Sequence, residues 1–454
     1  MTKRLSFLMV FALLAMTPMA AASDDTSKEA KDVDDNNEAG VSEAEDDPEF
    51  LHWEEHYRAT VIRTRVGEAD IKLSTYRGLE LKWRDFTAHV GGKIFVDYAH
   101  YFEDKNDLGA NKIGLRVLSL FTEGMLTKTW AYKVNGDLFS NGGQSKSGGG
   151  IALSSFYVRY LGFDPTLVTY GVQTEPFSLE AETGNLDVTF MERALPNALA
   201  PGDTLGIAAS TYRERWSLQG GLFGGQVGSA KDQGDQGYGL SGRVTVLPIQ
   251  SDLPIRTDFD LLHVGVSASI RNVSSSEDVS FRNRPESGLT DVRYVNTGEI
   301  EGADTISRFG LEVAAQRGPY ALQGEYMRAD VGRGSGFPDV HFDGGYISAN
   351  WFLTGEQRRY IRNGGYFGGA KNPTHKYGAL ALAARYSTIN FNSRDIRGGR
   401  ENNVTLGVNW YVNEQMRVMA NYIFVDTDIF ANDDGRALGD DSPEIFQMRF
   451  QYDF

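Results

Sequence analysis

An alternation of apolar and polar side chains is the feature that most restricts how this chain can fold. It is clearest at the C-terminus, where each second residue is apolar and most of these are aromatic. A two-residue period is the period of a β-strand whose two faces meet different surroundings. In this final segment the apolar residues are Phe446, Met448, Phe450, Tyr452 and Phe454, and the polar ones are Gln447, Arg449, Gln451 and Asp453.

The same period returns along most of the chain and predicts about sixteen strands. A soluble β-sandwich also alternates, but repetition over so many strands, with aromatic residues near strand ends, favours a membrane barrel. Unpaired amides in hydrocarbon cost several kcal/mol each, so a sheet in a membrane has to close. The fold class is therefore all-β, a transmembrane antiparallel β-barrel. The predicted strands are 89–102, 111–122, 129–139, 151–162, 166–174, 204–212, 215–226, 236–247, 255–270, 305–316, 319–330, 340–354, 376–389, 402–412, 415–428 and 444–454.

The lengths of the links between these strands support the same fold. With the N-terminus in the periplasm, the periplasmic links are mostly short, as at Asn413-Glu414. The long links, residues 175–203, 271–304 and 429–443, then all face the outside. Outer-membrane barrels have short periplasmic turns and longer extracellular loops. One long link, near 355–375, falls on the periplasmic side and is the exception.

The first 22 residues have the pattern of a secretory signal. Lys3 and Arg4 precede an apolar core over 5–16, and small residues 20–22 supply a cleavage site after Ala22. The apolar core is too short for the alternative reading, a membrane anchor. The sequence therefore predicts export to the cell outer membrane by a cleaved signal peptide.

The next segment, 23–50, is strongly acidic. It holds 12 Asp and Glu against two Lys and few large apolar residues. Such a composition cannot bury enough surface to fold, so a disordered periplasmic tail is expected. Residues 51–88 are then a periplasmic lead-in segment, and 89–454 form the barrel.

Several function classes are disfavoured by the sequence. A net charge of −16 argues against nucleic-acid binding, and the chain has no cysteine. No G-x-S-x-G or H-E-x-x-H motif is present, so we expect no enzyme, no catalytic residue, no metal site and no cofactor. The acidic run within 429–443 lacks the ligand order of a calcium loop and is expected to be solvated.

Several short motifs resemble one known family. They are, in chain order, 177–180 (FSLE), 191–193 (MER), 353–356 (LTGE), 405–411 (TLGVNWY) and 419–422 (MANY). Together they make the chain, from about Asp70 to Phe454, similar to the phosphate-selective porin O and P family of Gram-negative outer membranes. The resemblance implies a sixteen-stranded barrel, a homotrimer, and a loop at 175–203 that folds inward and narrows the pore.

The residues that make such porins phosphate-specific are not all present here. By this resemblance, phosphate-specific members have an arginine pair at the positions of Leu115 and Arg116, and this chain keeps only Arg116. They also have loop lysines near the positions of Ala181 and Leu186, and this chain keeps neither lysine. These three departures argue against phosphate selectivity.

The charges of the expected pore lie in two groups. A charged ring in a narrow pore favours ions of the opposite charge. The inward loop is mainly acidic, so by itself it suggests a pore for cations or neutral solutes. The strand residues expected to line the wall are basic. Each of these charges has an alternative reading as an ordinary solvated lumen group. The constriction-loop residues are Glu175, Glu180, Glu182, Asp187, Glu192, Arg193 and Asp203, and the pore-wall residues are Lys93, Arg116, Lys133, Arg159, Arg215 and Arg243.

The expected function is passive diffusion of small hydrophilic solutes or ions through a water-filled pore in the outer-membrane bilayer, with a modest ion preference. The alternative is a receptor or adhesin barrel that acts through its extracellular loops. A stably bound macromolecular partner would favour that alternative, and ion conductance would favour the pore.

Overall fold

The computed structural model describes one of the two units into which the chain divides, the unit Ala59–Phe454. The signal (1–22), the acidic tail (23–50) and the first part of the lead-in segment lie outside the described residues. Those described are 61–74, 78–102, 105–106, 108–109, 111–140, 152–226, 237–250, 260–274, 277–334, 336–370, 373 and 375–454.

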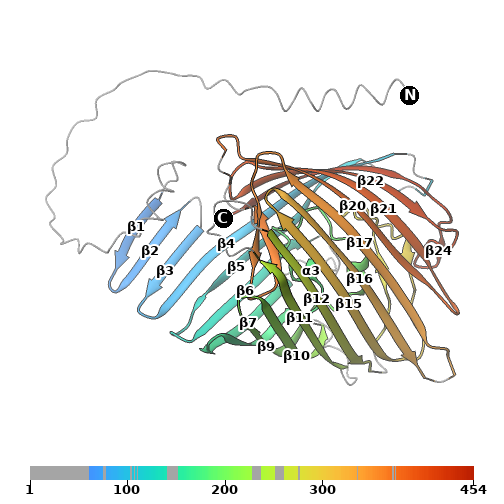
Figure 1. Cartoon of the computed structure of the whole chain (residues 1–454), viewed down its shortest axis with the longest axis horizontal. Helices are drawn as coiled ribbons and strands as arrows, with labels where there is room; N and C mark the ends of the chain where they lie inside the picture. Colours follow the sequence, from blue (N-terminus) through green and yellow to red (C-terminus); the bar gives the residue numbers. More distant parts are fainter. Residues whose placement is uncertain are drawn as a thin grey trace, which may run out of the picture. The chain divides into compact units, whose positions relative to one another are not determined.

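Sixteen antiparallel strands form a closed barrel, as the sequence predicted (Figure 1). Each strand pairs with the next, and the last closes on the first through Glu444↔Phe102 to Asp453↔Lys93. No helix in the described part of the chain is long and apolar enough to span a membrane. The strands are β4 (Phe86–Phe102), β5 (Lys112–Met125), β6 (Trp130–Ser140), β7 (Ala152–Phe163), β8 (Thr166–Thr174), β9 (Asp203–Tyr212), β10 (Trp216–Gln226), β11 (Tyr238–Gln250), β12 (Asp260–Asn272), β15 (Ala303–Arg317), β16 (Tyr320–Arg333), β17 (Val340–Phe352), β20 (Ala379–Ser393), β21 (Ile396–Tyr411), β22 (Met416–Thr427) and β25 (Glu444–Asp453).

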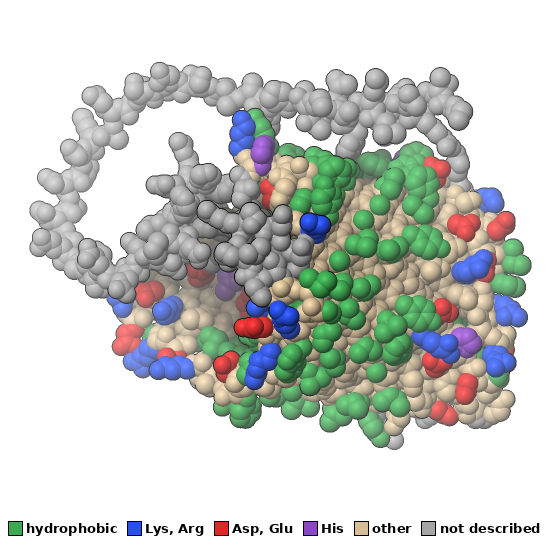
Figure 2. Space-filling model, in the orientation of Figure 1, with side chains coloured by type: hydrophobic (Ala, Val, Ile, Leu, Met, Phe, Trp, Pro, Cys, Tyr) green, Lys and Arg blue, Asp and Glu red, His purple; other side chains and the backbone are tan. Residues whose placement is uncertain are grey.

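The two faces of the barrel wall invert the pattern of a soluble protein. On β21, Val404 and Leu406 are 43% and 49% exposed, whereas Asn403 and Thr405 are 0% and 1% exposed. Apolar residues therefore point outward and polar residues point into a filled interior. Figure 2 shows hydrophobic side chains spread over the outer wall, with charged ones mainly toward the strand ends. This arrangement suits a wall that faces lipid.

Three long connections carry short elements of their own. The constriction loop (175–202) holds α3 (Leu179–Glu182) and the 3-10 helix η1 (Leu195–Leu199). The second loop (273–302) holds β13 (Arg282–Asn283) and β14 (Val295–Asn296). The loop before β25 holds β23 (Asn432–Asp433) and β24 (Arg436–Ala437).

The exceptional periplasmic link also has a structure. It forms the periplasmic hairpin, β18 (Arg358–Ile361) and β19 (Tyr366–Ala370). Phe367 of this hairpin packs with Leu179 of α3 and with Leu247 and Leu261 of the wall. The hairpin therefore folds into the barrel and meets the constriction loop there.

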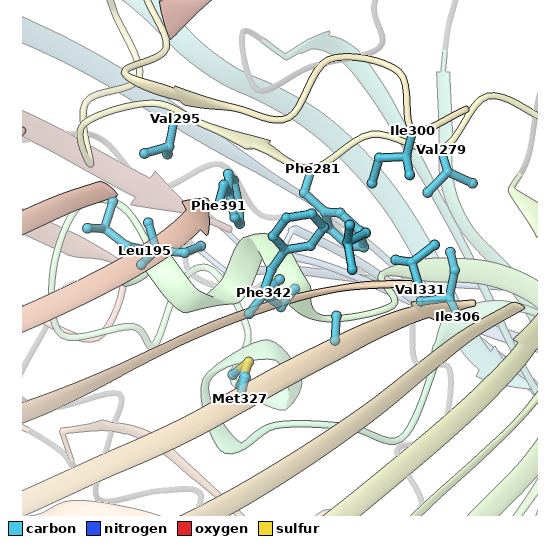
Figure 3. Packing of buried hydrophobic residues seen from close by; sticks show 14 of the residues in the cluster. Leu195, Val279, Phe281, Val295, Ile300, Ile306, Met327, Val331, Phe342 and Phe391 are labelled. Atoms are coloured by element: carbon cyan, nitrogen blue, oxygen red, sulfur yellow. The ribbon is translucent and has the colours of Figure 1, made fainter. Parts of the chain in front are cut away.

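An apolar core inside the barrel fixes the two inward loops. Leu195 of η1 and Phe281 and Val295 of the second loop pack against Phe342 of β17 and Phe391 of β20 (Figure 3). Rings of Phe281, Phe342 and Phe391 lie 5.5 to 6.2 Å apart. Packing of this kind makes the loops a fixed part of the interior.

Three strands that the sequence did not predict precede the barrel. They are β1 (Val61–Val66), β2 (Ala69–Ser74) and β3 (Gly78–Trp83), and they form an antiparallel extension of the wall. β3 pairs with the start of β4, through Trp83↔Phe86 to Leu79↔Val90. Figure 1 shows them in blue at the end of the barrel where the C-terminus lies.

Candidate pore and constriction

An open cavity of about 980 Å³ runs along one side of the barrel interior. Among the described residues, side chains of strands β4 to β10 and Arg449 of β25 line the cavity on the side of the barrel wall. Its other side comes from the constriction loop and the second loop. On the other side of the interior, the periplasmic hairpin contacts Arg243 of β11 and Gln316 of β15, and the constriction loop contacts Arg417 of β22. The cavity is therefore the candidate pore.

Two arginines clamp the constriction loop to the strands that close the barrel. Arg116 Nε and Nη2 donate to the two carboxylate oxygens of Glu192, each at 2.9 Å. Arg449 Nη2 donates to Glu192 Oε1 at 2.9 Å and holds Asp97 of β4 through two bonds of 2.8 Å. Burial works against ionisation of Glu192, but Arg116 and Arg449 outweigh it and lower its pKa to about 2.

Polar groups at both ends fix the short helix α3. Glu325 of β16 accepts hydrogen bonds from the backbone nitrogens of Leu179 and Glu180, at 2.9 and 2.8 Å. At the other end, Arg193 donates to the carbonyls of Glu180 and Thr183, at 3.0 and 2.7 Å. Buried backbone groups need such partners, so these bonds set the inner edge of the loop.

Three further acidic residues of the loop, predicted to face the pore, also act as anchors. Glu175 is buried and accepts bonds from Thr204 (2.9 Å), Ser241 and Arg271. Glu180 accepts from the backbone nitrogen of Ala194 at 2.9 Å and lies 3.5 Å from Arg385. Asp187 accepts from the backbone nitrogen of Gly369 in the periplasmic hairpin, at 2.7 Å. The structure places none of these three on the cavity surface.

Besides Glu192, two of the predicted constriction acids line the cavity, Glu182 of the loop and Asp203, the first residue of β9. Asp203 accepts a hydrogen bond from Thr174 at 2.6 Å. Burial raises the pKa of Glu182 to about 7; Glu312 and Asp203 add to the rise, and Arg243 and Arg159 oppose it.

Four of the six predicted wall residues line the cavity. Lys93 donates to Asn185 at 2.9 Å, Lys133 to Glu123 at 2.7 Å, and Arg159 to Thr169 at 2.9 Å. The fourth is Arg116, already described. Lys93, Arg159 and Arg193 donate these hydrogen bonds to neutral oxygens and not to carboxylates.

The other two predicted wall residues lie elsewhere. Arg215 is exposed in the turn before β10, because that strand begins one residue later than expected. Arg243 points inward, but the periplasmic hairpin covers it. It pairs with Glu312 at 2.7 Å and donates to the carbonyls of Gly364 and Gly365, each at 2.7 Å. Both therefore differ from the sequence expectation.

Three arginines of the second loop also line the cavity, although the sequence did not predict them there: Arg282, Arg284 and Arg293. Arg284 donates to Asp291 at 3.2 Å. Burial and the charges of Arg284 and Arg282 lower the pKa of Arg293. The clustered arginines of residues 282–293 were a visible signal, but only the folding of this loop inward makes them part of a pore.

Among the described residues, no group of three or more His, Asp or Glu side chains is arranged to hold a metal ion.

Comparison with known proteins gives consistent results. A family model described as "Phosphate-selective porin O and P" matches residues 89–454. Porin O of Pseudomonas aeruginosa is 28% identical over 427 residues, which cover 85% of this chain and 93% of that protein. The structure of an anion-selective porin from Comamonas acidovorans aligns with a TM-score of 0.51 at 13% identity, over 81% of this chain and 99% of that one. A trimer form of OmpT from Vibrio cholerae aligns with a TM-score of 0.50 at 13% identity, over 81% and 99%. At these identities the two structures show a shared fold.

Proposed function

Because the chain belongs to the phosphate-selective porin O and P family and is an outer-membrane porin, a passive diffusion channel, we propose that its pore prefers small hydrophilic anions to cations. The family is one of channels, which favours this function over an enzyme and over a receptor or adhesin barrel. The proposal changes the expectation from the sequence, where the loop acids suggested cations or neutral solutes.

The charge of the cavity lining carries the proposal. Among the described residues, nine basic side chains line the cavity against five acidic ones. An excess of one sign in a narrow, water-filled space concentrates the counter-ion. The basic residues are Lys93, Arg116, Lys133, Arg159, Arg193, Arg282, Arg284, Arg293 and Arg449, and the acidic ones are Asp137, Glu182, Glu192, Asp203 and Glu286.

Ion pairs reduce the charge of both signs, since Lys133 pairs with Glu123 and Arg449 pairs with Asp97. Glu192 is bound by Arg116 and Arg449. Glu286 of the second loop is bound by Arg385 and by the hydroxyl of Thr405 at 2.8 Å. Most of the loop acids that suggested cation selectivity in the sequence therefore form hydrogen bonds and ion pairs that hold the loop in place.

We also propose that the pore has no dedicated phosphate site. Leu115 pairs with Val96 on the wall and does not line the cavity. Ala181 and Leu186 stand where the resemblance places lysines, and neither lines the cavity. The one retained arginine, Arg116, is occupied by Glu192.

Planar-bilayer recordings test this function. In a potassium chloride gradient, the reversal potential is expected to have the sign of an anion-preferring channel, and Lys93→Gln is expected to reduce it. Arg215→Gln, which removes an exposed turn charge outside the cavity, is the matched control and should leave it unchanged. A cation-preferring reversal potential in the unmodified channel would overturn the proposal. Conductance that saturates at low phosphate concentration would show a phosphate-binding site and would overturn the second proposal.

We propose that the chain assembles as a homotrimer. The support is the family and the trimer form of a structurally similar porin. On a denaturing gel, an unheated sample should migrate as a trimer and a heated one as a monomer. Monomer migration without heating would count against it.

We propose export by a cleaved signal peptide of residues 1–22, followed by the acidic tail of 23–50 in the periplasm. N-terminal sequencing of the protein from purified outer membranes should begin at Ser23. Retention of Met1 in that protein would exclude cleavage.

A further inference from the structure

The extension β1–β3 has one apolar and one charged face. Cross-strand register places Ile62, Leu73, Leu79 and Val90 side by side in one row across β1, β2, β3 and β4. The row at the other end of the same face runs from Val66 through Ala69 and Trp83 to Phe86. Because side chains alternate along a strand, Arg63, Lys72 and Glu80 point to the opposite face.

The apolar face is uncovered in the described part of the chain. Ile62 and Val66 are 56% and 64% exposed, and Leu73 and Trp83 are both 48% exposed. Large apolar residues gathered on one face of a small sheet mark a surface that contacts another apolar phase. Its three strands β1–β3 lie outside the segment that the family model matches, which begins at residue 89.

This face continues the lipid-facing surface of the barrel. On β4, Val90 shares its face with Ile94 and Val96, which pair with Tyr452 and Phe450 on the outer side of β25. The apolar side chains of the extension therefore lie on the outer face of the wall, and its charged side chains lie on the lumen side.

The end of the extension is level with the aromatic rim of the barrel. Phe86 stacks on Tyr132 of β6, with ring centroids 6.2 Å apart and an angle of 11° between the rings. Thr87 accepts a hydrogen bond from the backbone nitrogen of Met125, the last residue of β5, at 2.9 Å. Lys128 in the next turn lies 3.9 Å from Asp85. Aromatic rims of membrane barrels sit at the water interface.

We propose that the apolar face of β1–β3 rests on the periplasmic leaflet of the outer membrane and binds phospholipid. Trp83 is then an interfacial anchor at the depth of Phe86 and Tyr132. Arg84, whose guanidinium lies 5.5 Å from the Trp83 ring and donates to Glu68 at 2.7 Å, lies in the same exposed turn at that depth. The continuity with the wall favours lipid over a second copy of the chain as the occupant.

Single spin labels test this contact, because the chain contains no cysteine that would compete for the label. Leu73→Cys reports the apolar face, Lys72→Cys the charged face one residue away, and Leu120→Cys the lipid-facing wall. The full chain is reconstituted in vesicles of phosphatidylethanolamine and phosphatidylglycerol. Collision rates are then measured with oxygen, which enters the bilayer, and with a water-soluble nickel complex.

Labels at residues 73 and 120 are expected to collide several-fold more often with oxygen than with nickel, and the label at 72 is expected to show the reverse. Equal access of nickel to residues 73 and 72 would overturn the proposal in favour of a solvated face. Exclusion of both reagents from residue 73, with spin–spin broadening between protomers, would overturn it in favour of a second copy. Ile62→Cys and Arg63→Cys repeat the comparison on β1 and guard against a variant that fails to fold.

Discussion

Glu192 accepts two parallel hydrogen bonds from Arg116, each 2.9 Å long, in the geometry with which an arginine would hold an oxyanion. Glu192 comes from the constriction loop and Arg116 from the wall. The carboxylate thus occupies a cationic position that a solute would otherwise use, and it lowers the positive charge of the pore.

Replacing Glu192 by glutamine should therefore increase anion preference. One unit charge about 4 Å away is worth roughly 1 kcal/mol in water, or about fivefold in an ion ratio. Reversal potentials in salt gradients measure this change. Because the pKa of Glu192 is about 2, its effect in the unmodified channel should be constant between pH 4 and pH 8. An unchanged ion ratio in Glu192→Gln would contradict the assigned role.

Glu182 should make anion preference depend on pH. Its pKa is raised to about 7, so it is neutral below that pH and negative above it. Anion preference should rise as the pH falls from 8 to 6, because a negative charge leaves the cavity lining. Glu182→Gln should hold the high-preference state at both pH values. A pH dependence that survives in this variant would assign the titration to another group.

Arg243 should matter for stability and not for selectivity, in contrast to the wall role predicted from the sequence. Its removal takes the arginine from the buried carboxylate of Glu312, which then keeps the bond to His263 at 2.9 Å. Removing one partner of a buried ion pair typically costs about 3–5 kcal/mol. Arg243→Met should lower the thermal unfolding temperature and release the periplasmic hairpin. The double variant with Glu312→Gln should recover much of the loss, and no recovery would mean that the hairpin carbonyls dominate.

The second-loop arginines should speed anion entry. Arg282→Gln and Arg293→Gln should each reduce anion conductance at low salt, and the reduction should shrink at 1 M salt because charges are then screened. Arg436→Gln, on an exposed part of the loop before β25, is the matched control. A reduction that is the same at all salt concentrations would point to altered loop packing instead.

The sequence was sufficient for the barrel because alternation reports the two environments of each strand directly. Val404 and Asn403 show this: the period alone assigns one to lipid and the other to the interior. It also located Lys93, Lys133 and Arg159 on the cavity, since register and inward direction are local properties of a strand.

The sequence did not predict which charges of the constriction loop face the pore, because contacts between segments distant in the sequence determine this. Glu175 and Glu180 have the residue type of a cation filter, but Arg271 and Arg385, roughly 100 and 200 positions away in the sequence, neutralise them. The periplasmic hairpin gave no periodic signal that it enters the barrel and covers Arg243. The strands β1–β3 alternate as the barrel strands do, yet the two-residue period is clear only from about residue 89 onward, so residues 51–88 are predicted only as a periplasmic lead-in segment.

The interior is divided unevenly between the strands. Solutes meet β4 to β10, whereas β11 to β22 grip the inward loops, as when Arg417 of β22 donates to the Val188 carbonyl at 2.9 Å. Substitutions on the first half of the wall, at positions other than Lys93 and Arg116, can thus change permeability while the contacts that hold the loops stay intact. Substitutions that change solute preference between related channels should therefore accumulate on β4 to β10, and purifying selection should act more strongly on β11 to β22.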